Sequence, residues 1–110
     1  MPTPGEGFKL ITAGRLIDST GGPPIQNGAV LINGSTIERV GQAKDVAAPE
    51  GAPVEEFHFP DMTVMPGMVD CHTHNNGFGD GRAGDELTTL PDEVLTLQSA
   101  RNARTSLFTG

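Results

Sequence analysis

Apolar and polar positions alternate loosely in parts of the first half of the chain, whereas the C-terminal segment follows a helical period. Alternation predicts short strands within residues 8–18 and 54–60, and two β-branched runs predict strands at 29–32 and 35–40. Ala13-Gly14 interrupts the first run and predicts two short strands joined by a tight turn. Asn33-Gly34 separates the next two runs and favours a hairpin with a type I′ turn, because both central positions of that turn need a positive φ.

The C-terminal segment is predicted to form a helix that begins near Pro91, with Thr89 resembling an N-terminal cap and Gly110 at a natural C′ position. Its apolar positions recur at steps of three and four residues and form one stripe: Val94, Leu97, Ala100, Ala103 and Leu107. We interpret this stripe as packing surface. It is expected to lie against the strand that precedes it, as a β/α unit of a parallel sheet.

Between these regions, residues 63–70 predict a buried strand that leads into His72 and His74. Residues two apart on a strand share a face and are about 6.6 Å apart along it. The two imidazoles can therefore converge on one divalent cation, and imidazole is a ligand for zinc, iron, nickel and copper. A bare H-x-H pattern also describes two solvated side chains, so the preceding strand and the following loop carry the metal-site hypothesis.

Three nearby residues carry further expectations. Asp70 shares the face of the histidines, where it either accepts a hydrogen bond beside the site or ties down the end of the strand. Cys71 points to the other face and is expected to be buried and inert. His58 is expected to be a half-exposed strand residue without a functional role.

Residues 75–87 are expected to form a mobile loop over the metal site. Residues 79–84 match G-x-G-x-x-G letter by letter. A dinucleotide-binding turn needs the first glycine directly after a strand and the last glycine at the start of a helix. Because the histidines intervene and the next helix is expected only near Pro91, we do not interpret this loop as a nucleotide site.

Composition narrows the function classes. The chain has 110 residues and a net charge of −7, which argues against a nucleic-acid surface. No apolar run approaches a membrane span, and the N-terminus lacks the features of a signal peptide. A single cysteine excludes an intrachain disulfide and fits a reducing compartment, so a cytoplasmic location is expected.

Residues 66–74 resemble the "P-G-hydrophobic-hydrophobic-D-x-H-x-H" signature of the metal-dependent amidohydrolase superfamily. Residues 11–18 and 27–41 resemble the N-terminal β-rich segment of that family, and residues 100–110 resemble its first barrel helix. The similarity is greatest to the imidazolonepropionase-like and prolidase-like branch. The ordered combination is far more specific than the H-x-H pattern alone.

The resemblance implies an α/β fold in two parts. Residues 1–60 would belong to a β-rich composite sandwich, and residues 61–110 would supply the first strand, loop and helix of a TIM-like (β/α)8 barrel. His72 and His74 would bind a catalytic divalent metal, with zinc expected, that activates water and polarises the scissile carbonyl of an amide or cyclic amide. The remaining ligands of such enzymes come from later strands, so no catalytic residue is assigned within this chain.

The expected partners are the remainder of the barrel, from the same gene product or a separate chain, and a small-molecule amide substrate. Neither nucleic acid nor membrane is expected, and a homo-oligomer is compatible with the sequence. A complete barrel needs about 200 residues or more. We therefore expect the N-terminal portion of a hydrolase that is inactive on its own. The alternative is a stand-alone, non-catalytic β-rich module in which His72 and His74 form a structural or weak metal site.

Overall fold

A computed structural model describes residues 7–109 of the chain, which form a four-stranded sheet followed by two α-helices. The chain divides into two compact units between Pro66 and Gly67. The first unit holds the sheet and the second holds the helices together with the histidine-containing segment. The assignment of residues 1–60 to a composite sandwich and of 61–110 to a barrel stays a prediction.

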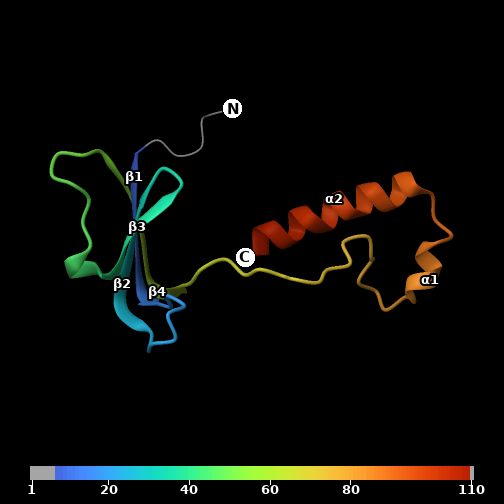
Figure 1. Ribbon diagram of the computed structural model, residues 1–110, viewed down its shortest axis with the longest axis horizontal. Helices are drawn as coiled ribbons and strands as arrows, with labels where there is room; N and C mark the ends of the chain where they lie inside the picture. Colours follow the sequence, from blue (N-terminus) through green and yellow to red (C-terminus); the bar gives the residue numbers. More distant parts are fainter. Residues whose placement is uncertain (1–6, 110) are drawn as a thin grey trace. The chain divides into compact units, whose positions relative to one another are not determined.

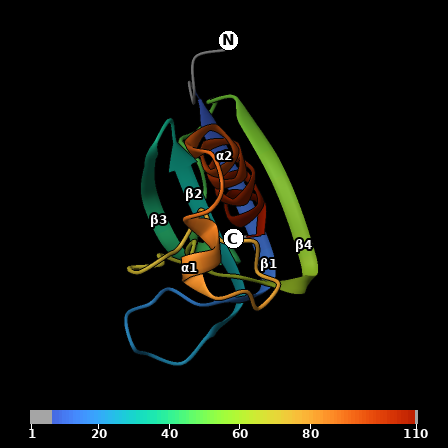
Figure 2. The same cartoon turned by 90° about the vertical axis from the view of Figure 1, so that its right-hand side faces the viewer.

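The sheet is mixed. Its strands are β1 (Phe8–Leu16), β2 (Ile25–Asn33), β3 (Thr36–Gln42) and β4 (Val54–Val64). They are ordered β3-β2-β1-β4, as Figure 2 shows. β1 pairs antiparallel with β2 and parallel with β4, while β2 and β3 form an antiparallel hairpin. The connection from β3 to β4 includes the short 3-10 helix η1 (Ala43–Asp45) and crosses from one edge of the sheet to the other (Figure 1).

The predicted hairpin is confirmed, but its predicted turn type is wrong. Asn33 belongs to β2 and pairs with Thr36, so Gly34 and Ser35 are the two central residues of the turn. Of these two, only Gly34 has a positive φ, at 60°. A glycine at the first central position is typical of a type II′ turn, whereas type I′ requires a positive φ at both positions.

The prediction of two short strands within residues 8–18 is also wrong, because β1 runs unbroken through Ala13-Gly14. The irregularity lies on β4: Ala13 pairs with Phe59, whereas Arg15 pairs with Thr63, so β4 bulges at Pro60. A Cβ atom at Gly14 would overlap the carbonyl oxygen of Pro60. Gly14 therefore permits the close approach of the bulge and does not mark a turn.

The hydrophobic core of the first unit lies on one face of the sheet. Ala29 and Leu31 point to this face from β2 and pack with Val46, which follows η1. All three are at most 5% exposed. The opposite face is also apolar and forms a hollow of about 220 Å³ lined by residues that include Ile11, Val30, Ile32, Ile37, Val40 and Val64. Val30 is buried on this face, whereas Val40 and Ile37 remain 44% and 62% exposed, so the hollow is open along β3.

The expected strand at 54–60 is confirmed and extends to Val64, but the buried strand predicted over residues 63–70 is wrong beyond that point. The last ladder bond runs from the Ile17 amide to the Val64 carbonyl at 2.9 Å, where β1 has already ended. Pro66 has no amide hydrogen to donate, and Val69 is 85% exposed. Within the described part of the chain, residues 65–70 lack a neighbouring strand, so the apolar run has no ladder to join.

The second unit contains α1 (Gly84–Leu87) and α2 (Asp92–Thr109). The predicted C-terminal helix is confirmed, although Thr89 is not its cap, because its hydroxyl donates to the Glu86 carbonyl at the end of α1. The Pro91 carbonyl accepts the first bonds of α2, from the Val94 and Leu95 amides. The expected C′ position of Gly110 lies outside the described residues.

The apolar stripe of α2 does not form the packing surface that its pattern predicts. Leu97 and Leu107 are 73% and 79% exposed, and α2 has no fully buried residue. The helix α1 was not predicted from the sequence, because one helical turn is too short to show a periodic pattern of apolar residues.

The loop after β1 is fastened by Asp18, whose side chain accepts hydrogen bonds from the Thr20 amide at 3.0 Å and the Thr20 hydroxyl at 2.8 Å. These bonds, the backbone amide first, favour the charged carboxylate and lower the pKa of Asp18. Because the pKa of Asp18 is lower in the folded state than in the unfolded state, the ionised carboxylate stabilises the fold when the pH is above the unfolded-state pKa. This stabilisation is lost as the pH falls through the folded-state pKa. We expect the NMR titration midpoint of Asp18 to lie below the ordinary aspartate value, and to return toward that value in Thr20→Ala, which lacks the hydroxyl donor. A midpoint for Asp18 at the ordinary aspartate value would contradict the contact.

Candidate metal centre

The structure brings His72 and His74 together on an irregular segment instead of a strand. Their Nε2 atoms are 3.0 Å apart, the ring centroids are separated by 5.0 Å, and the ring planes are inclined by 29°. The backbone bends at residues 71–72 and turns at 75–76. The predicted convergence of the two rings is thus present, but a bent backbone produces it and not the shared face of a strand.

The separation of the two Nε2 atoms suits a shared cation. Two imidazoles at the usual zinc–nitrogen distance with a tetrahedral angle have nitrogens about 3.3 Å apart. The observed distance of 3.0 Å is close to this value. With no metal bound, the contact requires one ring to donate a proton and the other to accept it. A metal would be bound by the unprotonated Nε2 of both rings, leaving the proton of each on Nδ1.

Asp70 contacts the backbone beside the pair. Its Oδ1 accepts a hydrogen bond from the His72 amide at 3.0 Å. Of the two roles expected for this carboxylate, the observed contact is the one that fastens the local backbone. A hydrogen bond from Asp70 to a ligating imidazole stays a prediction.

The turn after the pair is also held in place. The Gly77 amide donates to the His74 carbonyl at 3.0 Å, which closes the turn over Asn75 and Asn76. Asn102, on α2, donates to the carbonyls of Asn75 and Gly77. Asn102 was not among the residues that the sequence pattern indicated. The available signal was an asparagine inside a predicted helix, where this residue is a poor helix former.

The rest of the loop differs in part from expectation. Cys71 is exposed, so the expectation of a buried cysteine is wrong, because its segment does not pack in a sheet. In the glycine-rich stretch, Arg82 pairs with Asp80 at 2.8 Å and lies over the Phe78 ring. Gly84 opens α1, which contradicts the expectation of no helix before Pro91. The first glycine of the motif still does not follow a strand, so the match to the dinucleotide-binding pattern lacks its structural context.

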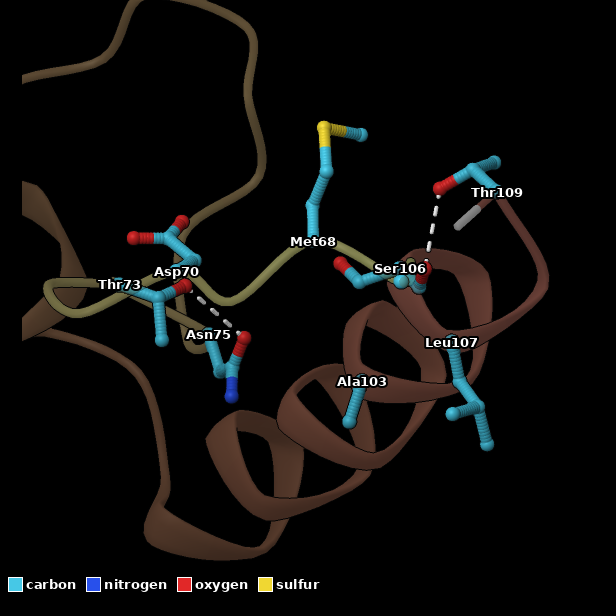
Figure 3. Close-up of a pocket in the computed structure, with 9 residues that line it drawn as sticks. Met68, Asp70, Thr73, Asn75, Ala103, Ser106, Leu107 and Thr109 are labelled. Carbon is cyan, nitrogen blue, oxygen red and sulfur yellow. Dashed lines mark hydrogen bonds between the residues drawn. The ribbon is translucent and has the colours of Figure 1, made fainter. Parts of the chain in front are cut away.

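A cavity of about 640 Å³ lies beside the histidine-containing segment within the second unit. Figure 3 shows it between residues 67–75 and the last turns of α2. Its polar lining includes Asp70, Thr73 and Asn75, and its apolar lining includes Met68 and Leu107. These two apolar residues are 72% and 79% exposed, so the cavity is open to solvent. The two histidines do not line it.

His58 lies on a strand, as expected, but it is exposed and not half-exposed. Its Nδ1 is 2.8 Å from the Thr12 hydroxyl and its Nε2 is 3.2 Å from the Glu56 carboxylate, so it links β1 to β4 across the sheet surface. Among residues 7–109, no three His, Cys, Asp or Glu side chains are grouped closely enough to hold a metal ion. In the same part of the chain, no helix is long and apolar enough to cross a bilayer.

The architecture is similar to that of two solved structures of the amidohydrolase fold. Ochratoxinase from A. niger aligns with 86% of this chain and 22% of its own, with a TM-score of 0.67 and 28% identity. A Xaa-Pro dipeptidase with bound methionine aligns over the same shares, with a TM-score of 0.62 and 19% identity, which supports the fold alone. The α/β class with a mixed sheet is therefore established, while the barrel stays a prediction. No protein-family profile matches the chain.

The sequence relatives of this chain belong to one group of enzymes, the imidazolonepropionases. An imidazolonepropionase from Chloroflexus aggregans is 48% identical over 50 residues, covering 46% of this chain and 12% of the relative. Imidazolonepropionases from Idiomarina loihiensis and Pseudomonas savastanoi pv. phaseolicola are 41% and 36% identical over 64 and 61 residues, or 15% and 14% of their own lengths. The chain thus spans a small part of these relatives. The resemblance to the amidohydrolase superfamily is confirmed, and over about half of the chain it is a resemblance to imidazolonepropionases.

Proposed function

We propose that this chain supplies two metal ligands, His72 and His74, to a metal-dependent amidohydrolase that cleaves amide or cyclic amide C–N bonds. The observation that carries the proposal is the 3.0 Å approach of the two Nε2 atoms. It occurs at the H-x-H of a signature shared with this superfamily, on a chain whose sequence relatives are imidazolonepropionases. Zinc is the expected metal, because two neutral imidazoles suit it and it readily takes further nitrogen or oxygen ligands.

When bound, the metal would supply activated water near neutral pH and polarise the scissile carbonyl. The residues of this chain would hold and orient it. His72 and His74 would present Nε2, and Asp70 would fix the backbone of the first ligand through its amide. A catalytic zinc usually has three protein ligands. We therefore propose that the other ligands come from the remainder of a barrel and that this chain alone does not catalyse hydrolysis.

The proposal is tested by native mass spectrometry and metal analysis of the protein purified from its producing cells without chelators. We expect a particle heavier than 11.5 kDa, the mass of this chain, that contains bound divalent metal. It should hydrolyse simple N-acyl amide or cyclic amide probes, and a chelator should remove this activity. Readdition of zinc should restore it, because the ligands remain in place after the metal is removed.

One outcome would instead favour the stand-alone module. A metal-free monomer of 11.5 kDa that unfolds cooperatively and hydrolyses neither probe would contradict the enzyme proposal. The sheet unit has a small core of its own around Leu31, so this outcome is physically accessible. The two candidates are therefore separated by the mass and metal content of one preparation.

A further inference from the structure

Among the described residues of the second unit, Asn102 makes the side-chain hydrogen bonds with the greatest sequence separation. Its Nδ2 donates to the Asn75 carbonyl at 2.7 Å and to the Gly77 carbonyl at 2.6 Å, over sequence separations of 27 and 25 residues. Both partners belong to the turn that directly follows His74. One side-chain amide thus connects the middle of α2 to the backbone beside the candidate metal ligands.

The orientation of this amide follows from its partners. A backbone carbonyl only accepts hydrogen bonds, so the NH₂ group of Asn102 must face the turn. Its Oδ1 points the other way and accepts a bond from Gln98 Nε2 at 3.0 Å, one helical turn earlier. Both amide hydrogens and the oxygen of Asn102 are therefore used, and Gln98 keeps the amide from flipping.

The two donated bonds of Asn102 do not serve the helix. Asparagine is a poorer helix former than alanine, and its side chain competes with helical backbone bonds. Asn102 is half-buried on α2, and both of its donated bonds leave the helix, whereas the bond that it accepts from Gln98 stays within α2. The donated bonds therefore stabilise the turn.

The turn transmits this restraint to the second ligand. The Gly77 amide donates to the His74 carbonyl, so the two residues are linked directly across the turn. Asp70 holds the backbone of His72 in a similar way from the other side of the pair. The two imidazoles are thus bracketed by one backbone restraint before them and one after them.

We propose that Asn102 is a positioning residue, which fixes the turn over Asn75–Gly77 and thereby holds the imidazole of His74 beside that of His72. This inference rests on the proposed function, because the separation of the rings matters for a bound metal. Figure 3 shows Asn75 and Ala103, the neighbour of Asn102, lining the same cavity, in agreement with the proximity of the turn to α2.

The test compares Asn102→Ala and Asn102→Asp with Thr105→Ala in the 110-residue chain. The aspartate variant keeps the side-chain shape but replaces the double donor with an acceptor that repels both carbonyls. Thr105 is the matched control, because its exposed hydroxyl donates only to the Arg101 carbonyl of the same helix. Three properties are measured: amide exchange at Gly77, the nuclear Overhauser effect between the two histidine rings, and the dissociation constant for Co²⁺.

In both Asn102 variants we expect the Gly77 amide hydrogen to exchange with solvent faster and the nuclear Overhauser effect between the two histidine rings to disappear. We expect both variants to bind Co²⁺ about tenfold more weakly. Helix content by circular dichroism should be unchanged in Asn102→Ala, because alanine favours the helix. Thr105→Ala should match the parent in all three properties. If Asn102→Asp fails to fold, Asn102→Ala still decides the question.

The inference is overturned if Asn102→Ala retains the parent's Gly77 exchange rate and ring-to-ring signal. A parent chain that binds no Co²⁺ contradicts the proposed metal function, but the exchange rate and the ring signal still decide whether Asn102 positions His74. The two proposals can therefore fail separately.

Discussion

Replacing both His72 and His74 with alanine is expected to abolish metal binding and to reduce hydrolysis by the complete assembly to the uncatalysed rate. In the proposed site, the two Nε2 atoms that lie 3.0 Å apart would be the ligands that this chain contributes, and alanine offers no donor atom in their place. Loss of two ligands leaves the metal with fewer protein donors than a catalytic site normally has. Metal content by elemental analysis and turnover of an amide probe measure the two effects.

His58→Ala is the matched control for this experiment. It also removes an imidazole, but one on the sheet surface that contacts Thr12 and Glu56. Its side chain is 61% exposed, so its loss should change stability little and leave metal content and turnover unchanged. Undiminished turnover in the His72/His74 double variant would rule out their role as ligands.

Gly14→Ala should strongly destabilise the sheet. The added Cβ would overlap the carbonyl oxygen of Pro60 in the bulge of β4. A backbone atom cannot move aside by changing rotamer, so β1 and β4 must separate. We expect a loss of about 3 kcal/mol in the free energy of unfolding, in the range of overpacked core sites. Urea denaturation monitored by circular dichroism measures this change.

Gly22→Ala provides the control for Gly14. An added Cβ at Gly22 would meet only the Thr20 hydroxyl at an ordinary contact distance of 3.6 Å. Its free energy of unfolding should stay within about 0.5 kcal/mol of the parent. Equal stability of the Gly14 and Gly22 variants would contradict the close packing of β4 on Gly14.

Local patterns in the sequence predicted those elements whose stabilising contacts are local. The hairpin around Gly34 and the helix α2 follow from residues within a few positions of one another. The interruption at Gly14 was misread because its cause, the bulge at Pro60, lies more than forty positions further along the chain. The only sign of the close approach between β1 and β4 in the sequence is the glycine at position 14, and a glycine within a strand pattern is equally compatible with a turn.

The convergence of the two histidine rings was predictable from the sequence, but the backbone contacts that support them were not, and the role of the rings as metal ligands stays a prediction. His72 and His74 were selected by a two-residue spacing, and the rings do converge, although the backbone bends at residues 71–72 instead of continuing as a strand. The apolar run before them suggested a strand, but hydrogen bonding to a neighbouring strand decides strand formation, and periodicity carries no information about that neighbour. Asn102 could not be found from spacing, because its partners are main-chain carbonyls, which leave no trace in residue identity.

The parallel pairing of β1 with β4 also imposes an order on synthesis. As the chain leaves the ribosome, β1, β2 and β3 can assemble as a meander, since each pairs with its neighbour in sequence. The free edge of β1 then stays open until Val64 has emerged, and an open edge invites pairing with another nascent chain. The histidines emerge only after this closing strand, so a newly made chain would expose the two candidate ligands only once β4 is available to cover the edge of β1.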